Sequence, residues 1–147
     1  MSSYLNLYLV PKKREKESIE PRPLLFQSYS RSTDVYQYFK EEVNPTFIGN
    51  GEEPNYTELN VTDASRVLRK AQSDLFEAKE DLNIKVDAFK ALSIPDNFET
   101  AVSEYIEDRR NIEDLQSAVH DIKSLQLLVR DIALNCTDFE KVLINID

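Results

Sequence analysis

Two long apolar stripes dominate the second half of the chain. Apolar residues recur there at intervals of three or four positions, which places them on one face of an α-helix. The first stripe comprises Ala64, Leu68, Ala71, Leu75, Ala78, Leu82, Val86 and Phe89. The second comprises Phe98, Val102, Tyr105, Ile112, Leu115, Val119, Ile122, Leu125, Val129 and Ile132, with Arg109 at one apolar position. The pattern predicts two amphipathic helices within residues 62–134.

The sequence between the stripes predicts a tight turn. Ser93 is followed by an acid three residues later, as in a capping box, and Pro95 fits the first turn of a helix, where its missing N–H is harmless. A turn at residues 93–96 makes the two helices antiparallel and sets residue i opposite about 188 minus i. We therefore expect Leu75 and Leu82 to be buried between the helices.

Arg109 is the one charged residue of the second stripe, and it tests the predicted register. Folding about the turn sets it opposite Lys79. A long aliphatic stem can cover an apolar seam while its guanidinium reaches a carboxylate at the rim. We therefore expect Arg109 to form an ion pair with Glu77 or Glu80. The alternative is that Arg109 points into solvent at an irregularity in the heptads.

The second helix changes character near its end, since residues 125–134 are apolar nearly all round. A helix that is hydrophobic on every side is usually buried. The predicted partner helix also runs out in this region. We expect this stretch to be the spine of a head domain.

The N-terminal residues predict a β-hairpin in that head. Leu5, Leu7 and Leu9 alternate with other residues, so residues 4–10 are expected to form a strand with one apolar face. Residues 24–29 are the second strand candidate. The two strands would pair antiparallel across a long charged loop.

Three further segments complete the head. Residues 34–43 show helical spacing after residue types that cap helices, so a short helix is expected. Residues 46–60 contain both glycines and no sustained period, which is typical of a connector. Residues 139–146 fit either a helix or a strand. We favour a strand added to the hairpin, because a two-stranded sheet alone is only marginally stable.

The predicted fold class is α+β and helix-dominated: a small antiparallel β-hairpin head with a short helix, plus a long antiparallel two-helix coiled-coil arm. A chain of 147 residues is close to the usual size of one domain. We expect a single domain, 1–147. It would comprise the β-hairpin, short helix and connector (1–61), the helical hairpin (62–134) and the C-terminal strand or short helix (135–147).

Charge restricts the classes of partner. The net charge is -9, yet residues 1–33 carry +3, whereas residues 34–62 and 94–134 carry -5 each. A negative field of this size repels phosphate backbones, so direct nucleic-acid binding is not expected. The sequence shows no signal-peptide pattern and no apolar run long enough to span a bilayer, so we expect a cytoplasmic protein without membrane contact.

The residues that usually carry chemistry are sparse. Cys136 and His120 are the only residues of their types, which leaves too few soft ligands for a zinc site within one chain. No glycine-rich phosphate loop and no nucleophile motif is present. We therefore expect no cofactor, no metal and no catalytic residues, and a protein that is not an enzyme.

A tyrosine and arginine face is the first candidate binding surface. Tyr4 and Tyr8 lie on the side of the first strand opposite its leucines, and Tyr29 with Arg31 is expected to join them across the hairpin. Tyrosine and arginine commonly anchor protein interfaces. The alternative is that the head's own helices cover this face.

An acidic surface at the start of the second long helix is the other candidate. Its residues are Glu104, Glu107, Asp108 and Asp114. They would dock a basic partner, or else serve only solubility.

These features favour a protein–protein interaction module, or a small structural or accessory protein, that acts through its helical hairpin. A coiled-coil hairpin buries one stripe per helix, so its flanks commonly pair with another protein or with a second copy. The first alternative is an acidic inhibitor that mimics nucleic acid and blocks a basic groove of a nucleic-acid-handling enzyme. The second is an enzyme of unknown class that uses the tyrosine and arginine face.

Overall fold

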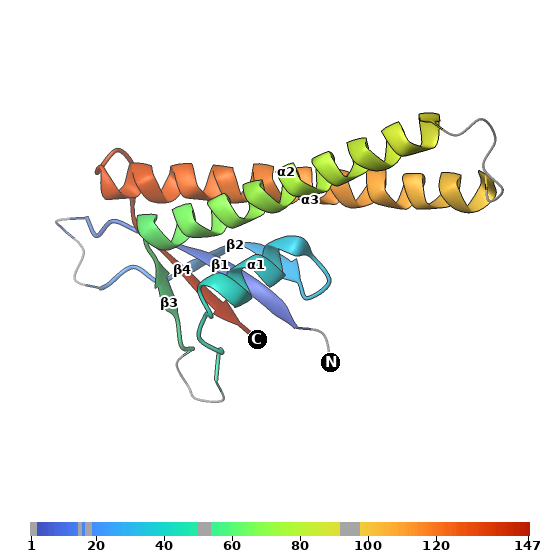
Figure 1. Ribbon diagram of the computed structural model, residues 1–147. Helices are drawn as coiled ribbons and strands as arrows, with labels where there is room; N and C mark the ends of the chain where they lie inside the picture. The colour runs from blue at the N-terminus through green and yellow to red at the C-terminus, as the bar shows by residue number, and fades with distance from the viewer. Residues whose placement is uncertain (1–2, 15, 17–18, 50–53, 92–97) are drawn as a thin grey trace.

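The computed structural model describes residues 3–14, 16, 19–49, 54–91 and 98–147, and it consists of a sheet with helices packed on one face. The ends of α2 and α3 that lie away from the sheet project beyond it as an arm (Figure 1). The helix-dominated α+β fold class predicted from the sequence is confirmed. The elements, in chain order, are β1 (Tyr4–Pro11), β2 (Leu24–Ser30), α1 (Asp34–Glu42), β3 (Thr57–Leu59), α2 (Val61–Ala91), α3 (Phe98–Ala133) and β4 (Phe139–Ile146).

The four strands form one antiparallel sheet in the order β2-β1-β4-β3. The C-terminal segment is a strand, as favoured from the sequence, and it occupies the centre of the sheet beside β1. Its β-branched residues Val142, Ile144 and Ile146 lie opposite Leu9, Leu7 and Leu5. Residues that are directly opposite in an antiparallel pair share one face, so these side chains together form the floor of the core.

The prediction of a featureless connector at residues 46–60 is wrong in part. Residues 57–59 form β3, which pairs with β4. Nearer the start of the segment, the Ile48 N–H donates to the Ile146 carbonyl at 2.8 Å, and the Ile146 N–H donates to the Thr46 carbonyl at 3.0 Å. A strand of three residues is too short to show an alternating pattern, which is why the sequence did not reveal it.

The core lies between the apolar face of the sheet and the three helices. Phe39 of α1 is fully buried, together with Val67 of α2 and Ile122 of α3. Asn44 and Asn135 adopt positive φ angles of 51° and 60° just after α1 and α3, a conformation that ends helices and that asparagine tolerates well. These two turns return the chain to the sheet.

The end of α3 is a spine of the core on one side only. Ile122, Leu125 and Val129 are buried against the head, as predicted. Leu127 and Leu134 are exposed, so the expectation that this stretch is buried on every side is wrong. The sheet and α2 cover the buried side of this stretch, and among the described residues nothing packs over the side that carries Leu127 and Leu134.

The two long helices pack against each other, but not in the predicted register. Leu82 is buried as expected, whereas Leu75 is only half-buried. Asp108, predicted to face residue 80, instead accepts a hydrogen bond from Lys85 Nζ at 2.9 Å. Gln126, predicted to face residue 62, donates to Ser65 Oγ at 3.5 Å. The true partners therefore lie three to five positions further along α2, roughly one helical turn.

The predicted ion pair of Arg109 is wrong for the same reason. Arg109 is exposed, and it forms no ion pair with Glu77 or Glu80, both of which the structure describes. The shifted register brings Lys85 to this level of α3. The predicted turn at residues 93–96 lies outside the described residues, as do the side chains of Phe89 and Phe98.

Candidate functional site

The sheet face turned away from the helices carries Tyr4 and Tyr8, as predicted. Tyr8 packs edge to face against Tyr56, with ring centroids 5.1 Å apart and an interplanar angle of 81°. Burial raises the pKa of Tyr8. Tyr29 does not join them, because it lies directly opposite Leu5 and therefore on the helix-covered face. Arg31 follows β2 and is exposed.

A buried polar network occupies the centre of the Tyr8 face. Asn145 is fully buried and Asn6 nearly so. Asn6 Nδ2 donates to Asn145 Oδ1 at 3.2 Å, Ser28 Oγ donates to Asn6 Oδ1 at 2.8 Å, and Asn145 Nδ2 donates to the Asn55 carbonyl at 3.1 Å. Every buried side-chain nitrogen and oxygen within the described residues has a hydrogen-bond partner. These amides thus satisfy one another, which is the arrangement of a structural network.

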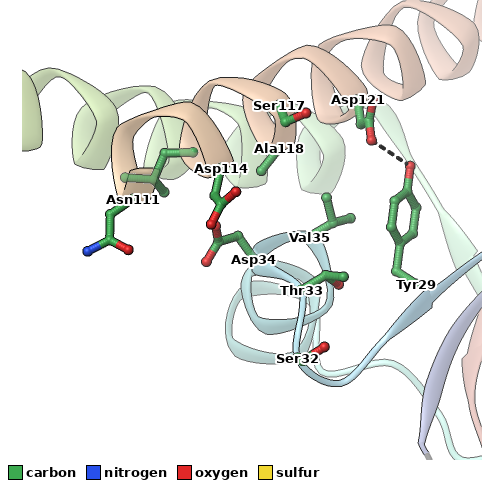
Figure 2. Close-up of a pocket in the computed structure, with 11 residues that line it drawn as sticks. Tyr29, Ser32, Thr33, Asp34, Val35, Asn111, Asp114, Ser117, Ala118 and Asp121 are labelled. Carbon is green, nitrogen blue, oxygen red and sulfur yellow. Dashed lines mark hydrogen bonds between the residues drawn. The ribbon is translucent and has the colours of Figure 1, made fainter. Parts of the chain in front are cut away.

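A cleft of about 500 Å³ lies between α3 and the start of α1 (Figure 2). Figure 2 shows Asp34 of α1 and Asp114 of α3 directed toward one another. Burial, and then the charge of Asp114, raise the pKa of Asp34. The lining residues are Tyr29, Ser32, Thr33, Asp34, Val35, Asn111, Asp114, Leu115, Ser117, Ala118 and Asp121.

Tyr29 closes one end of this cleft by hydrogen bonding to α3. Its hydroxyl donates to Asp121 Oδ2 at 3.2 Å, drawn as the dashed line in Figure 2. Burial, followed by the charge and the hydrogen bond of Asp121, raises the pKa of Tyr29 to about 12. The phenol therefore stays protonated at neutral pH and fixes β2 to α3, a role different from the predicted interface anchor.

The cleft holds carboxylates without the groups that would make them reactive. Its lining contains hydroxyls, an amide and three Asp side chains, but no Lys, Arg, His or Cys. Nowhere among the described residues do three or more His, Cys, Asp or Glu side chains gather as a metal site would require. The described helices also include none of the length and apolarity needed to cross a bilayer.

The predicted acidic surface of α3 is divided among three environments. Asp108 is bound to Lys85, and Asp114 lines the cleft. Glu104 and Glu107 are exposed on the arm. The four acids therefore have different neighbours, and their role as a docking surface stays a prediction.

The distal arm, defined as residues 76–91 and 98–112, carries the apolar surface that sequence reasoning missed. Five large apolar side chains there are between 37 and 68% exposed: Phe76, Ile84, Val102, Tyr105 and Ile106. Val102 and Tyr105 were assigned to the seam, but both are exposed. Phe76, Ile84 and Ile106 lie off the two stripes, which is the sequence signal that could have identified them.

These surfaces contain no set of residues diagnostic of one reaction. The Tyr8 face is internally hydrogen-bonded, the cleft is acidic, and the distal arm is apolar. Each is interpreted from its own chemistry, because no protein-family model, no curated protein and no solved structure matches the chain.

Proposed function

We propose that the protein is a protein-binding module that docks its partner on the distal arm. The observation that carries the proposal is the exposure of the five large apolar side chains defined above. Single exposed apolar residues are ordinary on protein surfaces, but grouped ones mark interaction sites. Three of the five are grouped by their spacing on α3, in the part of the hairpin that projects beyond the sheet (Figure 1).

The spacing of the exposed residues suits a helical or grooved partner. Val102, Tyr105 and Ile106 stand at positions i, i+3 and i+4 of α3, so their side chains share one face. Amphipathic helices commonly bind grooves or other helices through residues at this spacing. Tyrosine at the centre of such a group adds apolar area and a polar hydroxyl.

Two serine substitutions on α3 test the proposal with a matched control. Val102 and Leu127 are both 37% exposed, but only Val102 lies on the distal arm. Proteins captured from the source cell by the wild-type chain should be identified by mass spectrometry and then titrated as purified components. Val102→Ser combined with Ile106→Ser should weaken the main complex about tenfold or more, whereas Leu127→Ser should not.

The opposite outcome would reject the arm as the docking site. If Leu127→Ser weakens the complex and the distal variants do not, the contact lies at the head end of the hairpin. Light scattering of the purified protein measures its oligomeric state and so tests self-association. A dimer that the distal substitutions dissociate would identify the partner as a second copy.

The two alternative functions have less support. A nucleic-acid mimic needs a continuous run of free acids, whereas Asp108 is paired with Lys85 and Asp114 faces Asp34 in the cleft. Its binding would weaken steeply with salt, while an apolar contact would change little. An enzyme built on the tyrosine and arginine face lacks Tyr29 on that face.

A further inference from the structure

We infer that the outer edge of β2 is a second docking site, which accepts an extended segment of a partner protein with acidic residues flanking an apolar centre. The segment would add to the sheet as a fifth strand beside Leu24–Ser30. This inference rests on the head alone and is independent of the distal arm.

The backbone of β2 is available on one side. Among the described residues β2 pairs only with β1, which makes it an edge strand. The Arg31 N–H donates to the Ser3 carbonyl on the β1 side. The backbone N–H and C=O groups of successive residues point to alternate sides of a strand, so those of Ser28 and Ser30 point away from β1. The Ser30 carbonyl is taken by Thr33, whose N–H and Oγ1 donate to it at 3.0 and 2.7 Å. The Ser28 carbonyl accepts a longer hydrogen bond, of 3.5 Å, from Gln27 Nε2. The free part of the edge therefore comprises the Ser28 N–H and the outward backbone groups before it.

The free part of the edge is also apolar. Leu24, Leu25 and Phe26 are between 40 and 58% exposed. The register with β1 passes from Gln27 directly to Leu25, so Phe26 has no partner residue on β1 and forms a bulge. Edge strands are commonly protected from pairing by charged residues, especially lysine, yet Leu24–Ser30 contains none. The bulge at Phe26 is one protection that the strand does have, because a bulge twists an edge away from a partner.

Charge selects the class of partner. Arg22 and Arg31 flank β2, and residues 21–33 contain no acid, although the whole chain has a net charge of -9. Antiparallel pairing of two copies of β2 about its centre would set Arg22 of one copy near Arg31 of the other, and like charges opposite one another destabilise a sheet. A strand with acidic flanks would instead meet an arginine at each end. The favoured occupant is therefore a foreign acidic segment.

Proline at position 28 gives a test with a close control. Ser28→Pro removes an outward N–H, which an edge strand tolerates, and also removes the Ser28 Oγ bond to Asn6. Ser28→Ala removes only the side-chain bond.

The probe is a library of random 12-residue peptides displayed on phage, selected against the purified protein. Selected peptides should combine apolar centres with acidic flanks. Ser28→Pro should weaken their binding about tenfold relative to Ser28→Ala.

Amide chemical shifts and charge reversal complete the test. The selected peptide should perturb the amides of β2 and leave those of the distal arm unchanged, and Arg22→Glu with Arg31→Glu should abolish the preference for acidic flanks. Circular dichroism checks that each variant keeps its fold. A library without binders, or binders that Ser28→Pro and charge reversal leave unchanged, would overturn the inference. A wild-type dimer that Ser28→Pro converts to monomer would also overturn it, because the edge would then belong to a second copy.

Discussion

The two halves of the helical hairpin have similar sequence patterns but different surroundings. At the head end, α2 and α3 lie on the sheet and bury residues from both helices: Ala64, Val67, Ala71, Ala118, Ile122, Leu125 and Val129. In the distal arm, the buried apolar residues among those described are Leu82 and Ile112. The same heptad-like spacing thus produces a three-element core in one half and a two-helix seam in the other. An apolar stripe indicates that one face of a helix will be buried, but the rest of the fold decides which elements bury it.

This difference has an energetic consequence for the arm. A two-helix contact removes only one stripe of each helix from water, so most of the remaining apolar surface stays exposed unless a partner covers it. The head end buries two faces of α3, one on α2 and one on the sheet. Stability should therefore be concentrated at the head end, and binding capacity in the distal arm.

Alanine at two isoleucines of α3 tests this division most strongly. Ile122 is 1% exposed at the head end, and Ile106 is 51% exposed in the distal arm. Ile122→Ala should lower the free energy of unfolding by about 2 to 5 kcal/mol, because it leaves a cavity in a packed core. Ile106→Ala should lower it by less than about 1 kcal/mol. Urea unfolding followed by circular dichroism measures both. Equal losses would show that the distal arm is as tightly packed as the head.

Leu82 tests whether the distal seam has stability of its own. Leu82→Ala should cost about 2 kcal/mol, at the low end for a buried leucine, because the surrounding arm can collapse onto the space. Hydrogen exchange should quicken in the distal halves of α2 and α3 and stay unchanged in β1 and β4, since local regions open independently of the core. Faster exchange throughout the sheet would instead mean that arm and head unfold as one unit.

The acidic cleft at the head end predicts a smaller, pH-dependent effect. The pKa of the Asp34 carboxyl is raised, so the folded protein holds the carboxyl proton more tightly than the unfolded chain does. The free energy of unfolding therefore falls as the pH rises from the pKa of Asp34 in the unfolded chain to its pKa in the folded protein. Asp114→Asn removes one cause of the raised pKa. Its Tm should match the wild type at a pH low enough to keep Asp34 protonated and should exceed it slightly at a pH above the raised pKa of Asp34. A lower Tm near neutral pH would mean that the Asp114 carboxylate stabilises the cleft.

The smallest effect is expected at the ion pair of the distal arm. Lys85 hydrogen-bonds Asp108 at 2.9 Å, and that contact raises the pKa of Lys85, but both side chains are in contact with solvent. Exposed pairs contribute little to stability, so Lys85→Met should leave the Tm unchanged within error. A clear fall in Tm, cancelled in the double variant with Asp108→Asn, would show that the pair helps to set the register of the helices.

The long elements could be predicted from the sequence because many residues repeat one period. The helices α2 and α3 extend over many turns. The segment of β4 fits a helix or a strand, and the strand is favoured because its β-branched residues suit a sheet and a two-stranded sheet alone is marginal. The register of the two helices could not be predicted in the same way. Shifting one helix by about a turn sets apolar residues opposite apolar residues almost equally well, so the stripe fits several registers.

The sites were harder to predict because they depend on single residues from distant segments. One residue of register decides which face of a strand a side chain occupies, and the long loop between β1 and β2 does not fix that register, so Tyr29 was assigned to the wrong face. The cleft joins Asp34 of α1 with Asp114 and Asp121 of α3, and no sequence pattern connects the two helices. The apolar residues Leu24, Leu25 and Phe26 could be read from the sequence, but their exposure depends on the place of β2 at the edge of the sheet.

The strand β4 lies inside the sheet but is synthesised after the other three strands, so the sheet of the head can be completed only late in translation. β1 is made first, yet its inner edge pairs with β4, and β3 also has β4 as its neighbour. The Asp147 N–H even donates to the Tyr4 carbonyl at 3.1 Å, joining residues from opposite ends of the sequence. On the ribosome, α2 and α3 can form and pair before residues 139–146 emerge, whereas β1 has only β2 to pair with and β3 still lacks its neighbour. A nascent chain stalled before β4 should therefore display a helical hairpin with an unfinished sheet, the state in which chaperones would meet it.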